Sequence, residues 1–145
     1  DAHHVTAPHP VGDGMIRAMN LALDAAGVPA SEIGYVNAHG TGTPQNDRVE
    51  ALALSCVFGE GSILVSSTKS MVGHTMAAAG TVEAIATVLA LQHSLIPPTA
   101  NLRSLDPEVP FDCVPEVARP APVEVALSNS FGFGGQNVSL VFRKG

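Results

Sequence analysis

The stretch IGYVNAHGTGTP, residues 33–44, decides the fold of this 145-residue chain. Its beginning, Ile33 to Asn37, is a short apolar run and predicts a buried strand. The part from His39 to Pro44 is rich in Gly and Thr, and it predicts a loop that leaves the end of that strand. Pro44 suits the first turn of a helix, and apolar residues from Val49 to Val57 then recur on one face. A strand, a glycine-rich loop and a helix in this order are typical of an α/β protein.

A second unit of the same kind follows in the sequence. Ile63 to Ser66 predicts a strand, Thr68 to His74 a turn, and Thr75 to Gln92 a long helix of small and apolar residues. Because this helix is apolar nearly all round, we expect it to be buried on most sides. Residues 14–26, ahead of the first unit, predict an amphipathic helix that ends at Gly27.

The carboxyl-terminal third predicts an irregular segment and then a pair of strands. Residues 96–122 are rich in Pro and predict little regular structure. Val123 to Ser128 and Asn137 to Arg143 predict two strands, and the glycine loop from Phe131 to Gly135 between them favours an antiparallel pair. We therefore expect one domain over residues 1–145, with a mixed five-stranded sheet and helices on both faces.

Charge and cysteine content exclude several classes of protein. The net charge is −6 and the seven Lys and Arg residues are scattered singly, which argues against nucleic-acid binding. Cys56 and Cys113 form no CxxC motif, so the sequence predicts neither a metal site nor a disulfide, but two reduced thiols in a cytoplasmic protein. The chain begins at Asp1 without a Met, which we interpret as a fragment or a processed product.

Two histidines stand where the chemistry of an α/β protein is usually found. His39 and His74 each follow a predicted strand and are flanked by glycine, and ligands collect where loops leave the carboxyl ends of strands. Lys69 lies in the same turn as His74, next to an apolar helix, where a lysine needs a carboxylate partner. Glu50 is the candidate partner. Spacing alone leaves a structural role open for both histidines, and a solvated surface position open for Lys69.

The glycine loop before the last strand is ambiguous by itself. It could be a hairpin turn and nothing more, because a lone GxGG is weak evidence for phosphate binding. However, Phe131 and Phe133 alternate with glycines, and an aromatic side chain on a glycine hinge can act as a movable gate over a pocket.

Taken together, four stretches resemble the β-ketoacyl-[acyl-carrier-protein] synthases, in particular the discrete, elongating type II enzymes. The resemblance covers nearly the whole chain, from Ala2 to Arg143. The stretches that carry it are TAPHP at 6–10, NAHGTGTP at 37–44 with Asp47 and Glu50 behind it, STKSMVGH at 67–74, and SNSFGFGG at 128–135.

The resemblance implies a thiolase-like fold, in which two similar α/β halves pack together. This chain would be the carboxyl-terminal half, and the amino-terminal half, which carries the Cys nucleophile of the family, would be absent. Neither Cys56 nor Cys113 matches that nucleophile.

The resemblance also implies roles for individual residues. His39 and His74 would bind the malonyl thioester and promote its decarboxylation. Lys69 would be the third catalytic residue, paired with Glu50, which supports the two histidines.

Further residues would handle the substrate arm. Thr41 and Thr43 would contact phosphopantetheine, and Phe133 would be the gating phenylalanine. The gating loop would also contain Phe131, Gly132, Gly134 and Gly135. No cofactor is implied beyond the phosphopantetheine of acyl carrier protein, and no metal.

The activity implied is decarboxylative Claisen condensation of malonyl carrier protein with an acyl-enzyme thioester, in fatty acid or polyketide elongation. The partners implied are the amino-terminal half, acyl carrier protein, and a second subunit in a homodimer or a ketosynthase heterodimer. The alternative is a non-catalytic partner subunit similar to a chain-length factor. An isolated module that binds carrier protein is disfavoured, because the net charge of −6 does not suit an acidic partner.

Overall fold

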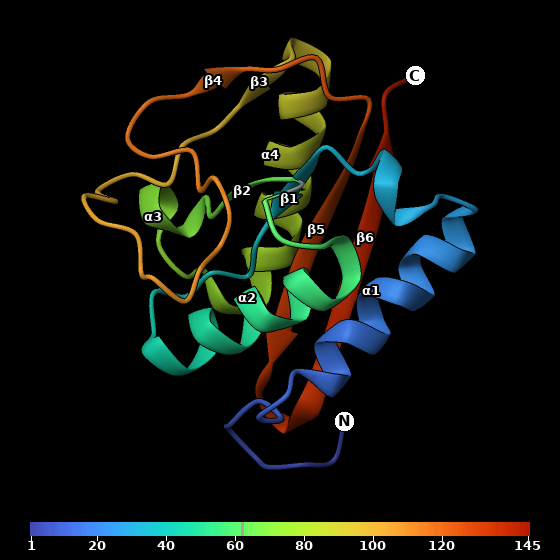
Figure 1. The fold of residues 1–145 in the computed structure, drawn as a ribbon, viewed down its shortest axis with the longest axis vertical. Helices are drawn as coiled ribbons and strands as arrows, with labels where there is room; N and C mark the ends of the chain where they lie inside the picture. The colour runs from blue at the N-terminus through green and yellow to red at the C-terminus, as the bar shows by residue number, and fades with distance from the viewer. Residues whose placement is uncertain (62) are drawn as a thin grey trace.

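Parallel and antiparallel strands share one sheet in the computed structural model, which describes residues 1–61 and 63–145. Figure 1 shows this sheet between helices that cover both of its faces. The elements are α1 (Asp13–Ala26), η1 (Ala30–Glu32), β1 (Tyr35–Asn37), α2 (Pro44–Phe58), β2 (Leu64–Ser66), α3 (Lys69–Val72), η2 (Met76–Ala78), α4 (Ala79–His93), β3 (Leu95–Ile96), β4 (Arg119–Pro120), β5 (Val125–Gly132), η3 (Phe133–Gly135) and β6 (Gln136–Arg143).

The main sheet has the strand order β2-β1-β5-β6. Strand β1 is parallel to both β2 and β5, whereas β5 and β6 pair antiparallel, as the sequence predicts. The mixed α/β class is therefore confirmed. The expected count of five strands is wrong for the described residues: at the fifth position, beside Leu64, a single bridge to Asp112 replaces a strand. Pro110 and Pro115 flank that bridge, and proline cannot donate to a ladder of hydrogen bonds.

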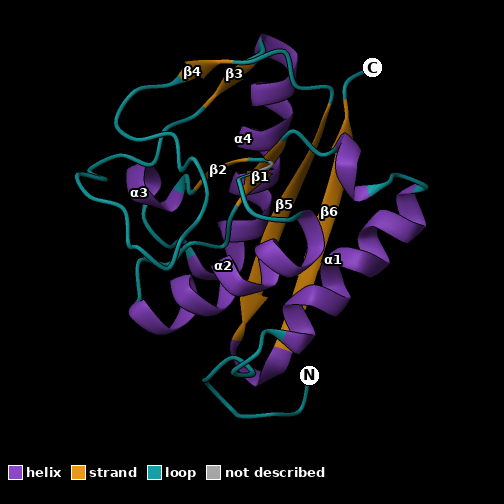
Figure 2. Ribbon diagram, viewed as in Figure 1, coloured by secondary structure: helices purple, strands orange, loops and turns teal. Residues whose placement is uncertain are grey.

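The two faces of the sheet bury two separate clusters of apolar side chains. Residues of α1 and α2, such as Met19 and Ala53, pack with Val36 and Leu127 on one face. On the other face, Leu91 of α4 packs with Tyr35 of β1 and Ala126 of β5. Successive side chains of a strand point to opposite faces, which explains why consecutive residues join different clusters. Figure 2 shows α1 and α2 together on one side of the strands.

Helix α4 differs from the expectation that it is buried on most sides. Met76 in the preceding turn is 75% exposed, and Ile85, Val88 and Leu89 are 56%, 45% and 46% exposed. The helix contacts the sheet along one face only, and its other apolar face has no partner among the described residues. The structure also divides the predicted 75–92 helix, because a short 3-10 turn at Met76–Ala78 precedes α4.

The irregular segment near the carboxyl end contains one small element that the sequence did not predict. Strands β3 and β4 form a two-stranded antiparallel sheet beyond the end of α4. The predicted helix stop at Gly27 is confirmed, since Gly27 adopts a left-handed φ of 64°. No described helix is both long and apolar enough to span a membrane.

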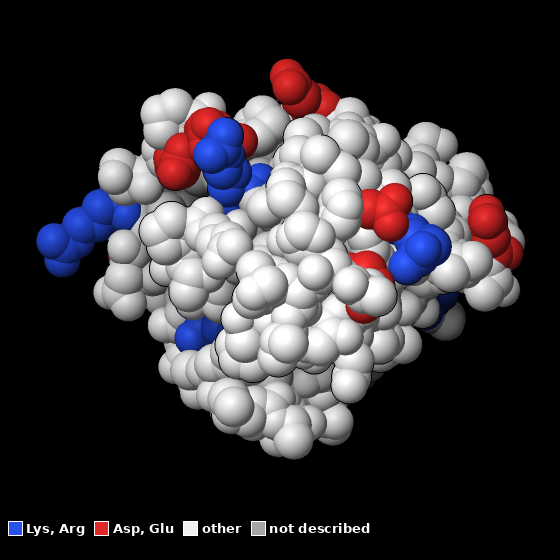
Figure 3. All heavy atoms as spheres, turned by 90° about the horizontal axis from the view of Figure 1, so that it is seen from below, with Lys and Arg blue, Asp and Glu red and all other residues white. Residues whose placement is uncertain are grey.

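Three loops meet at one edge because β1, β2 and β5 run in the same direction. The carboxyl ends of these strands lead to the His39 loop, to Lys69 with His74, and to Phe133. In Figure 1 the turn from β5 to β6 is at the lower end of the molecule, and α3, which follows β2, is at the left. Figure 3 views that end directly: charged side chains are few, basic ones lie singly, and a broad central area carries neither sign.

Two leucines on neighbouring strands provide a test of where the core lies. Leu127 of β5 is fully buried, whereas Leu140 of β6 is 45% exposed. We expect Leu127→Ala to lower the free energy of unfolding by about 2–5 kcal/mol, because it leaves a cavity between sheet and helices. The matched change Leu140→Ala should cost no more than about 0.5 kcal/mol. Equal losses in denaturant unfolding would contradict the placement of the core.

Candidate active site

His39 and His74 lie side by side at the edge where the three loops meet. Their ring centroids are 5.6 Å apart, with the rings nearly perpendicular. His39 is buried and its other side contacts Phe131 of β5, at 5.8 Å between ring centroids. His74 is exposed. His39 is therefore held inside the protein, whereas His74 faces solvent.

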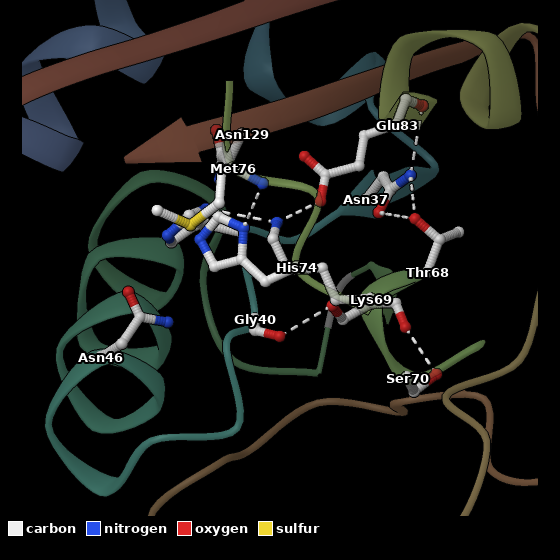
Figure 4. A network of polar contacts seen from close by, with 12 residues as sticks. Asn37, Gly40, Asn46, Thr68, Lys69, Ser70, His74, Met76, Glu83 and Asn129 are labelled. Carbon is white, nitrogen blue, oxygen red and sulfur yellow. Dashed lines mark hydrogen bonds and ion pairs between the residues drawn. The ribbon is translucent and has the colours of Figure 1, made fainter. Parts of the chain in front are cut away.

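Lys69 contacts the His39 ring through its ammonium group. Its Nζ lies 3.3 Å from Nδ1 of His39. The same ammonium group forms a buried ion pair with the carboxylate of Glu83, on α4. Figure 4 shows Lys69 pointing toward Glu83, with His74 beside them. Because an ammonium can only donate, Nδ1 of His39 must accept, and the ring proton is then on Nε2.

The tautomer of His74 is fixed in a similar way. Its Nδ1 accepts a hydrogen bond from the backbone N–H of Met76, at 3.2 Å. The proton of a neutral His74 ring is then also on Nε2. Both histidines consequently present an N–H donor at the ring position away from their structural contact, which is the arrangement that an anionic oxygen needs.

Glu50 does not pair with Lys69, so that prediction is wrong. Its two carboxylate oxygens accept hydrogen bonds from the backbone N–H groups of His39 and Gly40, each at 2.9 Å. The side-chain amides of Asn46 and Asn129 also donate to it. Glu50 lies on α2 behind the loop, within reach of the loop backbone, whereas α4 brings Glu83 to the ammonium. Glu50 therefore supports the histidine loop by holding its backbone.

Burial affects the ionisation of the two carboxylic acids and of His39. Burial raises the pKa of Glu83, and the nearby Lys69 opposes this rise. Burial also raises the pKa of Glu50, against the N–H donors that favour its ionised form. For His39, burial lowers the pKa from 6.5 to about 3, and the positive charge of Lys69 adds to the effect. His39 is therefore neutral near pH 7. Its Nε2–H can donate a hydrogen bond, but the ring does not carry the extra proton of a general acid.

A sharp turn brings the two histidine loops together. Gly40 has a left-handed φ of 44°, and a Cβ at this position would come within 2.5 Å of the Ser67 side chain. The Ser67 hydroxyl donates to the Gly40 carbonyl at 2.8 Å. This close approach requires glycine, and it joins the loop after β1 to the end of β2.

The structure places the other predicted residues more loosely around the histidines. The hydroxyls of Thr41 and Thr43 lie 2.9 Å apart, and Thr43 also caps α2 by accepting from the N–H of Asn46. Phe133 is 74% exposed. The predicted gating loop from Phe131 to Gly135 is shorter in the structure, because Phe131 and Gly132 belong to β5 and only Phe133, Gly134 and Gly135 form the turn.

The sequence analysis did not predict three buried residues of the site, Glu83, Asn37 and Asn129. Glu83 is a single acid within an otherwise apolar helix, a signal that could have identified the partner of Lys69. Asn37 donates through its side-chain amide to Thr68, to Thr87 and to the Glu83 carbonyl, so it joins β1 to α4. Asn129 joins β5 to Glu50. Nothing in the local sequence pattern marks either asparagine.

Neither cysteine has the surroundings of an activated nucleophile. Cys56 is an exposed free thiol on α2. Burial raises the pKa of Cys113 to about 11, with the carboxylates of Asp112 and Asp47 adding to the rise. A nucleophilic cysteine needs the opposite shift. Among the described residues, no group of three or more His, Cys, Asp or Glu side chains is arranged to hold a metal ion.

The new pairing of Lys69 leads to a double-mutant test. We expect Lys69→Ala or Glu83→Ala alone to lower the free energy of unfolding by about 3–5 kcal/mol, because each leaves a buried charge without its partner. The double variant should lose much less than the sum, as measured by urea unfolding. The control is the cycle of Lys69→Ala with Glu50→Ala. Coupling as large in that cycle would contradict the Lys69–Glu83 assignment.

The low pKa of His39 predicts how stability depends on pH. Between pH 6.5 and about 3 the unfolded chain binds a proton at this ring that the folded chain does not. Stability should therefore decrease as the pH falls below 6.5, by up to about 1.4 kcal/mol per pH unit from this residue. We expect His39→Gln to show a shallower decrease, in urea unfolding at several pH values. The exposed His93→Gln is the control, and a wild-type slope in His39→Gln would refute the assignment.

Comparison with known proteins agrees with the geometry. Residues 1–103 match the family model described as "Beta-ketoacyl synthase, C-terminal domain". The chain is 50% identical to 3-oxoacyl-[acyl-carrier-protein] synthase 2 of Synechocystis sp., over 99% of this chain but 35% of that protein. The chain thus spans about a third of the length of this curated relative.

Solved structures of ketosynthases superpose on the whole chain. The ishigamide ketosynthase/chain length factor has a TM-score of 0.96 and 45% identity, covering 100% of this chain and 36% of the other. A type II polyketide synthase acyl-carrier protein in complex with its ketosynthase, bound to a hexaketide, gives 0.93 and 36%, with coverage of 100% and 36%. The fold, the histidine pair and the match to the family model together show that this chain belongs to the β-ketoacyl synthase C-terminal domain family.

Proposed function

We propose that the protein carrying this chain catalyses decarboxylative condensation of a malonyl thioester with an acyl thioester. The observation that carries the proposal is the pair His39 and His74, 5.6 Å apart between ring centroids, each with Nδ1 occupied by a donor. Two Nε2–H groups are then free to donate to one oxygen. This matches the charge that develops when a malonyl thioester loses carbon dioxide.

The proposed reaction uses that geometry. The thioester oxygen of the malonyl group accepts hydrogen bonds from Nε2–H of His39 and of His74. When the bond to the carboxylate breaks, carbon dioxide leaves and the electron pair becomes an enolate, whose negative oxygen the two donors stabilise. The enolate carbon then attacks the acyl thioester carbonyl, forming the new carbon–carbon bond while the acyl-bearing thiolate leaves.

The remaining residues would position these parts. Lys69 keeps Nδ1 of His39 an acceptor. Burial lowers the pKa of the ring and the charge of Lys69 adds to this, so the donor stays neutral and its proton stays in place. Thr41 and Thr43 are proposed to contact the phosphopantetheine arm. Phe133, exposed on a turn with two left-handed glycines, is proposed to gate the opening.

The acyl group needs a nucleophile from elsewhere in the protein. We propose a cysteine in an amino-terminal half that packs on the uncovered apolar face of α4, formed by Met76, Ile85, Val88 and Leu89. The titles of the related structures name an acyl-carrier protein and a chain length factor together with ketosynthases. They support acyl carrier protein as the bearer of the substrates, and a homodimer or a ketosynthase heterodimer as the assembly.

A second candidate is a non-catalytic subunit that resembles a chain length factor. One related structure carries that name beside the ketosynthase. A subunit without catalysis has no need to fix the tautomer of two adjacent histidines or to bury a lysine against one of them. The intact set of His39, His74 and Lys69 therefore favours the enzyme.

Decarboxylation measured alone distinguishes the two candidates. In the full-length protein, we expect His39→Ala and His74→Ala each to slow decarboxylation of malonyl carrier protein by about 10²- to 10³-fold, because each removes one donor to the enolate oxygen. Release of carbon dioxide is the measurement, and acylation of the nucleophilic cysteine should be largely unaffected. The exposed His93→Ala is the control. Decarboxylation at the parent rate in both site variants would refute the proposed function.

A further inference from the structure

A cavity of about 700 Å³ lies beside the histidine pair, between α2, the end of β2 and the loop of residues 99–113. We call it the side pocket, and we call residues 99–113 the pocket loop. His74 and Thr41 line it, whereas His39, Phe131 and Phe133 do not. Its size falls in the range of pockets that hold small molecules. Thr41, Glu50, Lys69 and His74, which have roles in the site described above, lie at one wall, whereas the apolar part of the pocket at Leu54 and Phe111 has no role in the proposed mechanism.

The lining of the side pocket has an apolar wall, and its polar positions include hydroxyl groups, an amide and several carboxylates. Leu54, Val65 and Phe111 are buried and supply the apolar wall. Asp47 and Asp106 also line it. Lys69 is the one lysine or arginine among the described lining residues, and its ammonium is already bonded to Glu83 and His39. An anionic ligand would meet uncompensated carboxylates here, whereas a neutral apolar molecule would not.

The charge of Asp47 extends into the pocket. Cys113 lines the same cavity, and the Asp47 carboxylate contributes to the rise of the Cys113 pKa that burial produces. Asp47 uses one oxygen, Oδ1, to accept from Gly42 N–H and from Asn46. A hydroxyl donor on a bound molecule could use its other oxygen.

The pocket loop is held at both ends. Thr99 accepts from the N–H of Ser67, and the Ala100 N–H donates to the Ser70 hydroxyl, at 3.2 and 2.8 Å. These bonds join the loop to the chain on either side of Lys69. At its far end the carbonyls of Pro110 and Asp112 accept from the N–H groups of Gly61 and Val65, each at 3.0 Å. Between the two ends, Arg48 of α2 reaches Glu108 at 3.1 Å, but both side chains are more than half exposed, so the ion pair contributes little. The loop is thus anchored at both ends by backbone groups, and its middle part is linked to α2 by an exposed ion pair.

We propose that the side pocket is a second ligand site, which takes a neutral, mainly aliphatic molecule with a hydroxyl at one end. The aliphatic chain lies against Leu54 and Phe111, and the hydroxyl donates to Asp47. A carboxylate of the same chain length is excluded by Asp47 and Asp106. Because the pocket loop is bonded to Ser67 and Ser70, a ligand in the pocket contacts the segment that carries Lys69.

The test uses the full-length protein with n-octanol, and n-octanoate as the charged counterpart. We expect calorimetry to detect binding of n-octanol, and n-octanoate to bind at least about tenfold more weakly. Alkylation of Cys113, followed by peptide mass spectrometry, should slow about tenfold or more with n-octanol present, whereas alkylation of the exposed Cys56 should not change.

Two matched variants locate the ligand. Cys113→Phe fills part of the pocket and should weaken n-octanol binding about tenfold or more, whereas Cys56→Phe, the same change on the exposed face of α2, should leave it unchanged. If Cys113→Phe does not fold, Ser104→Trp on the exposed pocket loop fills the cavity from its other side. Absence of binding, equal binding of n-octanoate, or undiminished binding in a folded pocket variant would each overturn the proposal.

Discussion

The buried ion pair of Lys69 and Glu83 is the interaction on which the histidine site depends. Both side chains are at most 5% exposed, and an unpaired ammonium at such a depth would lose its proton or move toward water. Glu83 compensates the charge of the ammonium and holds it in place, and the ammonium then determines which nitrogen of His39 carries the proton. The pair also ties α3 to α4, so the same contact sets the electrostatics of the site and its position on the fold.

Two buried carboxylates divide the work of supporting the site. Glu83 compensates a charge, whereas Glu50 compensates none and instead accepts from the backbone of His39 and Gly40. A carboxylate is well suited to that second task, because its two oxygens can hold two successive N–H groups of a loop that has no regular structure. Asn37 and Asn129 complete the arrangement from adjacent strands.

The sequence was sufficient for most of the elements and for the candidate site side chains, and insufficient for their partners. Strand ends and glycines are local signals, so His39, His74 and Lys69 could be placed near one another before the structure was known. The choice between Glu50 and Glu83 as partner of Lys69 depends on how α2 and α4 pack against the sheet, which no local pattern contains. The same holds for Asn37, which bonds to residues of α4 about fifty positions away.

The predicted number of strands and the predicted burial of α4 were wrong for similar physical reasons. The sheet has four strands among the described residues, and beside β2 there is one bridge at Asp112, between two prolines that disfavour a longer strand. An all-apolar helix indicates burial, but it does not say which molecule covers each face, and in this chain the sheet covers only one.

The order of strands has a consequence for how the site comes into being during folding. Strand β1 pairs with β2 on one side and with β5 on the other, so that Asn37 faces both Ser66 and Ser128. The His39 ring contacts Phe131, near the end of β5. Strand β5 pairs with β1 only after the loop through residues 97–122 has closed. Closing long loops is the slow part of folding. A nascent chain therefore has both histidines long before it has a site, and the reactive geometry arises only when the last two strands have docked.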